Sequence, residues 1–229
     1  GDPASNTLSW RWVAGLHTPG KAYIARASNI NKYTNGRFNP GYQLNTQVSP
    51  PEGIDRPPVG PSPSVVDWQC TPASGLLITG DDLLPETLLG AREWPLVIAV
   101  QTTAWRSQSP VSDRVHRFAR AGLEDSMARN PGLRQEGPLG LNSPVDAEAV
   151  RDAALDAGVD QLLTPWVPTG PTADAMALLD PVLEAAGIRR QPVLRDWDLL
   201  HWPAATHGFF RFWKAARPLI LERQAARAE

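Results

Sequence analysis

The chain has 229 residues and a formal net charge of −2 at pH 7, and 42% of its residues are hydrophobic. This composition is typical of globular proteins and supplies enough apolar residues for the core of one or two domains. No apolar run approaches the roughly 20 residues that span a bilayer, and no secretory signal is visible. We therefore expect a cytoplasmic protein with no membrane partner.

The residue types available also argue against metal and disulfide chemistry. Cys70 is the only cysteine, which excludes an intrachain disulfide and a cysteine zinc site. The four histidines are scattered along the sequence and form neither an HxxxH nor an HExxH pattern. We expect no bound metal.

The first twelve residues place three polar or aromatic side chains, Asp2, Asn6 and Trp10, at intervals of four. On a helix these side chains share one face. A carboxylate, an amide and an indole on one face can hydrogen-bond to the polar edge of a planar heteroaromatic ring and stack beside it, which suits a flavin. Two other interpretations remain open, because an aspartate near a helix start is commonly an N-cap and paired tryptophans are common in protein cores.

The same segment, GDPASNTLSWRW at positions 1–12 followed by small residues, resembles the flavin-contacting helix of photolyases and cryptochromes. The resemblance implies FAD as the cofactor, with Asp2 close to the isoalloxazine ring and Asn6 beside flavin N5. It also implies that Trp10 is the first member of the tryptophan chain that reduces the excited flavin. Trp12 would line the pocket that receives a DNA lesion.

The activity implied by this resemblance is that of a carbon–carbon lyase, in which blue light drives an electron from FAD to a pyrimidine dimer in DNA. A cryptochrome-like photoreceptor without repair uses the same helix, and a non-catalytic α/β module is a third possibility. The sequence begins inside the motif and without Met, so we expect a C-terminal portion of a longer protein. We expect this portion alone not to hold FAD tightly.

Residues 13–40 continue the resemblance with a loop, an aromatic segment and a Phe-Asn-Pro stretch. The pattern predicts a short helix over 22–31 and a turn at Asn35-Gly36. Residues 1–40 hold five basic side chains and one acid, a net charge of +4, which leaves −6 for the remainder. Such a basic segment favours contacts with DNA phosphates, although scattered cations also solvate an ordinary helical surface.

Six prolines between polar residues in 42–64 predict an extended linker. The domains expected are therefore the C-terminal part of a helical FAD-binding domain at 1–41, the linker at 42–64, and a further domain at 65–229.

Beyond the linker, short apolar runs alternate with longer amphipathic stretches, which is typical of β-α-β units around a parallel sheet. Strands are predicted at 75–79, 95–100 and 160–164, with weaker patterns at 133–136 and 191–194. Helices are predicted at 112–128, 145–157, 173–186 and 208–225. The fold class expected is α/β, a Rossmann-like three-layer domain with a parallel sheet, preceded by the helical remnant of an all-α FAD-binding domain.

Ligands of such sheets bind beyond the carboxyl ends of the strands. Residues 79–82 and 164–166 leave two predicted strands at such places, but neither GxGxxG nor a P-loop is present. We expect Asp82 to cap the helix that follows it, and we expect a loop between Trp197 and Trp202.

The same domain resembles the α/β antenna domain of photolyases in four segments, here placed after the flavin helix rather than before it. The segments are GDDLLP at 80–85, VHRF at 115–118, LEDS at 123–126 and FFRFWK at 209–214. The resemblance leaves open whether an antenna chromophore binds.

Overall fold

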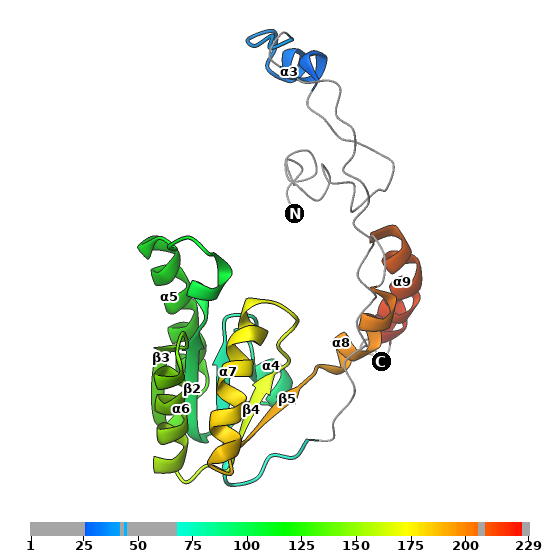
Figure 1. Cartoon of the computed structure of the whole chain (residues 1–229). Helices are drawn as coiled ribbons and strands as arrows, with labels where there is room; N and C mark the ends of the chain where they lie inside the picture. Colours follow the sequence, from blue (N-terminus) through cyan, green and yellow to red (C-terminus); the bar gives the residue numbers. More distant parts are fainter. Residues whose placement is uncertain (1–25, 42–43, 45–67, 206–208, 226–229) are drawn as a thin grey trace. The chain divides into compact units, whose positions relative to one another are not determined.

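The computed structural model describes residues 26–41, 44, 68–205 and 209–225 (Figure 1). The chain divides into two units, Gly1–Ser62 with Pro203–Glu229, and Pro63–Trp202. The predicted flavin-contacting helix lies outside the described residues, and so does the predicted linker apart from residue 44. No helix of the part that is described has both the length and the apolar character needed to cross a membrane.

The second unit is built on a five-stranded sheet in which every neighbouring pair is parallel and the order is β3-β2-β1-β4-β5. The strands are β1 (Ser74–Thr79), β2 (Trp94–Gln101), β3 (Gly132–Gly140), β4 (Gln161–Pro165) and β5 (Arg189–Val193). The predicted α/β parallel-sheet architecture is therefore confirmed. All five predicted strands are present, including the two with weak patterns.

Helices pack on both faces of this sheet and make three layers. One face is covered by α6 (Pro144–Asp156) and α7 (Pro171–Ala185), and the other by α4 (Glu86–Leu89) and α5 (Asp113–Arg129). Alternation along the central strands divides the core, because Leu77 packs toward α6 and α7 whereas Leu76 and Ile78 pack toward α4 and α5. β1 is buried along its whole length, as expected for a central strand of a parallel sheet.

Local sequence signals set the ends of α6. The Ser143 hydroxyl accepts a hydrogen bond from the Asp146 backbone N–H at 3.3 Å, and Pro144 occupies the first turn. Gly158 follows the helix with φ +65°, a left-handed conformation that favours glycine. The predicted helix start and stop are confirmed here.

Two short helices differ from the prediction. α8 (Asp196–His201) forms where a loop was expected between Trp197 and Trp202. α4 begins at Glu86 after Pro85 and has no side-chain cap, so the expectation that Asp82 caps it was wrong. The Asp82 carboxylate instead accepts a hydrogen bond from the Leu84 backbone N–H at 2.9 Å, because the chain turns there before the helix begins.

Both outermost strands contain a proline within the strand, Pro138 in β3 and Pro192 in β5. Next to Pro138, Gly137 has φ +109°, and a Cβ there would lie 2.5 Å from the Ala99 carbonyl oxygen. Glycine is therefore required where β3 passes β2 at its irregular register.

The described part of the first unit contains α3 (Ala27–Tyr33) and α9 (Phe209–Ala225). The helix predicted over 22–31 is present with a later start, since Arg26 precedes it in an extended conformation. Asn35 and Gly36 have φ values of +53° and +78°, which confirms the predicted turn.

Candidate functional site

The four residues predicted to contact flavin or lesion, Asp2, Asn6, Trp10 and Trp12, lie outside the described residues. Their roles stay predictions. The α/β unit is the part of the chain in which a site can be built from coordinates.

Because all strands are parallel, the carboxyl ends of β1, β2 and β4 lie at the same end of the sheet. Strands β2 and β3 follow on one side of β1, and β4 and β5 lie on its other side. Ligands of open α/β sheets bind at this kind of edge. Thr79 ends β1, Gln101 ends β2, and Thr164 lies one residue before the end of β4. The loops that follow Thr79 and Gln101 surround the candidate site.

A cavity of about 410 Å³ lies at the carboxyl ends of β1 and β2, against α5. We call it the β1–β2 cavity. Its apolar wall comes largely from the face of α5 that carries Val115, Phe118, Ala119 and Gly122, because these positions recur at intervals of three and four. Leu83 from the β1–α4 loop also lines it.

Gly122 lets α5 lie close to Leu83 of the β1–α4 loop. A Cβ on Gly122 would lie 3.0 Å from the Leu83 Cδ1 atom, so a larger residue would push Leu83 aside. Gly80, at the end of β1, also lines the cavity, and a Cβ there would have no neighbour closer than the Arg106 guanidinium at 3.8 Å.

The polar end of the cavity is formed by the residues that follow β2. The Gln101 side-chain amide donates to the Thr103 hydroxyl at 3.2 Å and to the His116 carbonyl at 2.8 Å, which fixes its orientation. Its carbonyl oxygen receives no hydrogen bond from the residues that the structure describes. The Thr102 hydroxyl bonds to the Thr172 hydroxyl at 3.0 Å, which ties this end to α7. The side-chain oxygen of Gln101 can therefore accept one hydrogen bond from a ligand.

Two charged side chains, Arg106 and Asp125, line the cavity, and both are more than half exposed. The Arg106 guanidinium is 3.8 Å from the Asp81 carboxylate, and its side chain is 53% exposed, so this ion pair is weak. A single partly neutralised arginine is a poor match for a phosphate, which is normally held by several donors or by a helix N-terminus. The β1–β2 cavity thus fits a small, largely apolar molecule that donates one hydrogen bond.

A carboxylate network supports the outer end of the β1–α4 loop. Arg129 donates to Glu86 at 2.8 Å and also bonds to Asp125, which lines the cavity. Burial alone would raise the pKa of Glu86, but hydrogen bonds from Arg129, its own backbone and Asn130 outweigh burial and hold that pKa below its usual value. The Glu86 bond in turn raises the pKa of Arg129.

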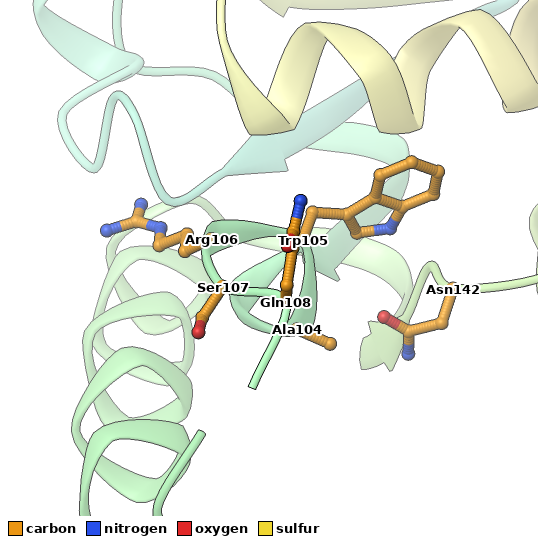
Figure 2. Close-up of a pocket in the computed structure, with 6 residues that line it drawn as sticks. All are labelled: Ala104, Trp105, Arg106, Ser107, Gln108 and Asn142. Atoms are coloured by element: carbon orange, nitrogen blue, oxygen red, sulfur yellow. The ribbon is translucent and has the colours of Figure 1, made fainter. Parts of the chain in front are cut away.

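A second cavity of about 440 Å³ lies on the other side of the 3₁₀ turn η1 (Thr103–Arg106). Figure 2 shows Trp105 and Arg106 leaving this turn in opposite directions, with Asn142 on the Trp105 side. The Trp105 indole N–H donates to the Leu141 carbonyl at 2.7 Å, so its polar atom is already engaged. Six residues line it: Ala104, Trp105, Arg106, Ser107, Gln108 and Asn142. It offers no apolar wall comparable to that of α5.

The two loops singled out in the sequence do not meet in one site. Trp166, after β4, lines a separate cavity of about 170 Å³ between α7 and β5. That cavity is bordered by Asp180 and Arg190, which form a two-bonded ion pair with both distances 2.6 Å. The β4 loop therefore contributes nothing to the lining of the β1–β2 cavity.

Arg195, which follows β5, binds across the sheet edge to the β1–α4 loop. Its guanidinium pairs with Asp82 through both nitrogens and also donates to the Leu84 carbonyl at 3.0 Å and the Thr87 hydroxyl at 3.1 Å. The bond to Asp82 raises the pKa of Arg195. This clamp holds the loop that carries Gly80 and Leu83.

Comparisons with family models, with curated proteins and with solved structures find no match. No cluster of three metal-ligating side chains occurs within residues 26–41, 44, 68–205 and 209–225.

Three of the four segments quoted for the antenna-domain resemblance contribute to the lining of the β1–β2 cavity. They do so through Gly80 and Leu83, through Val115 and Phe118, and through Leu123 and Asp125. Sequence analysis missed the polar end at 101–103 and Arg106. The only available signal was their position directly after the predicted strand at 95–100.

Proposed function

We propose that this chain belongs to a photolyase-like flavoprotein in which blue light drives electron transfer from FAD to a pyrimidine dimer in DNA. The flavin-contacting motif at 1–12 supplies the cofactor and electron-transfer residues of this proposal. Asp2 and Asn6 would hold the isoalloxazine ring, Trp10 would pass electrons to it, and Trp12 would stack on an extruded base. FAD supplies the redox chemistry, and the protein sets its orientation and potential.

The observation that carries the proposal is that two parts of the chain matched to the antenna domain, the β1–α4 loop and helix α5, line one cavity. Residues 80–85, 115–118 and 123–126 were each matched to the antenna domain by sequence alone, and they lie around the β1–β2 cavity. The last two segments share the cavity because both lie on α5, so the independent agreement is the packing of residues 80–85 beside that helix. This supports an antenna-like role for the α/β unit.

The β1–β2 cavity would then hold a small planar ligand. The α5 face around Val115 and Phe118 offers apolar contact, and Gln101 offers an acceptor at one edge. A ligand that carries its charge on a phosphate would have to leave that group outside the cavity, at the rim near Arg106. A neutral heteroaromatic ring fits best.

The test is light-driven reduction of flavin in the full-length protein. Replacing Trp10 by Phe should slow photoreduction by an order of magnitude or more while FAD stays bound, because phenylalanine is a poorer electron donor than tryptophan. Trp105→Phe is the matched control, since Trp105 lies in the α/β unit and bonds to Leu141. A full-length protein that holds no flavin, or equal photoreduction rates in both variants, would contradict the proposal.

A repair assay separates the two light-dependent alternatives. Illumination of the full-length protein with an oligonucleotide containing a pyrimidine dimer should restore intact pyrimidines. Normal photoreduction with no repair would instead favour a cryptochrome-like photoreceptor.

A further inference from the structure

The polar end of the β1–β2 cavity contains two side chains that are bonded to each other. Gln101 and Thr103 both line the cavity, and the Gln101 amide nitrogen donates to the Thr103 hydroxyl at 3.2 Å. The same nitrogen donates to the His116 carbonyl at 2.8 Å. A glutamine side chain has two N–H donors, one for each of these bonds. The orientation of the Gln101 amide is therefore fixed before any ligand binds.

One acceptor and one donor are left over at this end of the cavity. Within the described part of the chain, the Gln101 side-chain oxygen receives no hydrogen bond. The Thr103 hydroxyl accepts from Gln101 but donates to no acceptor among the residues that the structure describes. Thr103 is only 4% exposed, and buried polar groups normally have partners. This end of the cavity is therefore complementary to a ligand that supplies one donor and one acceptor.

The wall formed by α5 is apolar and largely uncovered. Phe118 is 82% exposed and Val115 is 45% exposed, although both line the cavity. A ring in the cavity would shield part of both side chains from water, which is favourable. The volume of about 410 Å³ lies within the range of small-molecule sites, which combine apolar walls with a few fixed polar groups.

The charges around the cavity favour a neutral ligand. Arg106 and Asp125 both line the cavity and carry opposite charges. Each is already paired, Arg106 with Asp81 at 3.8 Å and Asp125 with Arg129. A charged ligand would therefore find no unpaired opposite charge, and it would also meet a charge of its own sign.

We propose that Gln101 and Thr103 select a cyclic amide, a lactam, as the ligand of the β1–β2 cavity. The lactam N–H donates to the Gln101 oxygen, and the lactam carbonyl accepts from the Thr103 hydroxyl. The ring of the ligand lies against α5 at Val115 and Phe118. A lactam carries its donor and its acceptor on one edge, which matches the neighbouring acceptor and donor of the cavity. The inference deepens the proposed function, on which the ligand-binding role of this cavity rests.

The test is the affinity of the full-length protein for 2-quinolone, a lactam with two fused rings, measured by ligand-observed NMR titration. The comparison ligand is N-methyl-2-quinolone, which keeps the rings and the carbonyl but lacks the N–H donor. 2-Quinolone should bind about tenfold more tightly, because the N-methyl compound leaves the Gln101 oxygen without a partner.

Variants separate the polar contact from the apolar one. Thr103→Val removes the hydroxyl with little change of shape and should weaken 2-quinolone binding about tenfold. It should leave the binding of naphthalene, which has two rings and no polar atom, unchanged. Phe118→Ala should weaken both ligands by the same factor. The matched control is Thr164→Val, because Thr164 is an equally buried threonine near the end of β4 that does not line the cavity. Circular dichroism checks that all three variants are folded.

Four results would overturn the inference. The first is the absence of saturable 2-quinolone binding, and the second is equal affinity for 2-quinolone and its N-methyl derivative. The third is 2-quinolone binding by Thr103→Val that equals that of Thr164→Val. The fourth is a parallel loss of 2-quinolone and naphthalene binding in Thr103→Val, which indicates a changed cavity rather than a lost hydrogen bond. Flavin photoreduction in the same samples keeps the two proposals apart, because selective lactam binding without photoreduction contradicts only the proposed function.

Discussion

At the scale of single residues, the ion pair between Arg195 and Asp82 is the contact on which the geometry of the candidate site most depends. Asp82 and Arg195 are separated by 113 positions in sequence, and both side chains are largely shielded from water. Hydrogen bonds to charged groups contribute about 1.5–3 kcal/mol when they are shielded, and removing one partner leaves the other charge without compensation. The loop that lines the β1–β2 cavity is therefore held by a contact from the far end of the unit.

Replacing Arg195 by Met should lower the free energy of unfolding by about 2 kcal/mol, as measured by urea denaturation. Arg134→Met is the control, because the ion pairs of Arg134 are more exposed and should contribute less than about 1 kcal/mol. Equal losses in the two variants would mean that the clamp is no stronger than a surface ion pair.

The lowered pKa of Glu86 predicts how stability depends on pH. A carboxyl group whose pKa is lower in the folded state stabilises the fold above its unfolded pKa and loses this contribution as the pH falls through the folded value. The stability difference between the parent and Glu86→Gln should therefore be largest at neutral pH and shrink as the pH falls below the usual value of 4.5.

The measurement is urea unfolding of both proteins at neutral pH and at steps below 4.5. Glu148→Gln serves as the control, since Glu148 is exposed on α6 and forms no ion pair with the described residues. A Glu86 difference that does not change with pH would contradict the assigned network.

At the scale of elements, two glycines with positive φ test different physical effects. Gly137 has φ +109° and no room for a Cβ beside Ala99, whereas Gly158 has φ +65° and open space around it. Gly158→Ala should cost about 1 kcal/mol from backbone conformation alone. Gly137→Ala should cost about 3 kcal/mol, because overpacking against the backbone of β2 is added.

Urea denaturation of both variants measures this difference directly. The two substitutions remove the same flexibility from the unfolded chain, so the contrast between them isolates the clash. Similar losses would show that β3 can move away from β2.

The elements that sequence predicts well are those with a repeated pattern. The strands predicted at 75–79 and 95–100 lie within observed strands, and the one predicted at 160–164 overlaps β4, which begins one residue later at Gln161. β3 extends four residues beyond its predicted end at Glu136, because Gly137 and Pro138 interrupt the alternation although the strand continues. α4 and α8 have four and six residues, too few to show a helical period.

The candidate site was predictable only in part, because some of its residues gain their roles from contacts between distant elements. Gly80 and Phe118 lie in segments that sequence analysis had already selected, and the cavity brings them together. Gln101 gains its role from the orientation imposed by Thr103 and His116, which depends on packing between β2 and α5. The clamp from Arg195 to Asp82 depends on strand order, which composition and periodicity do not specify.

At the scale of the whole molecule, the α/β unit has a complete core of its own. Two clusters of buried side chains lie on opposite faces of the sheet, and both are formed by residues within 63–202 and its helices. We therefore expect a segment of residues 63–202 to unfold in a single cooperative urea transition, as small single domains do. A broad, non-cooperative loss of circular dichroism would show that this unit needs the rest of the chain.

The prolines of the two outermost strands bear on how the protein behaves at high concentration. An open sheet edge is a template on which a strand from another molecule can form, and this is a common route to aggregation. Pro138 and Pro192 each remove one backbone N–H from such an edge. Both ends of the sheet therefore resist lengthening by strands of neighbouring molecules, which protects a parallel sheet that forms slowly from non-local contacts.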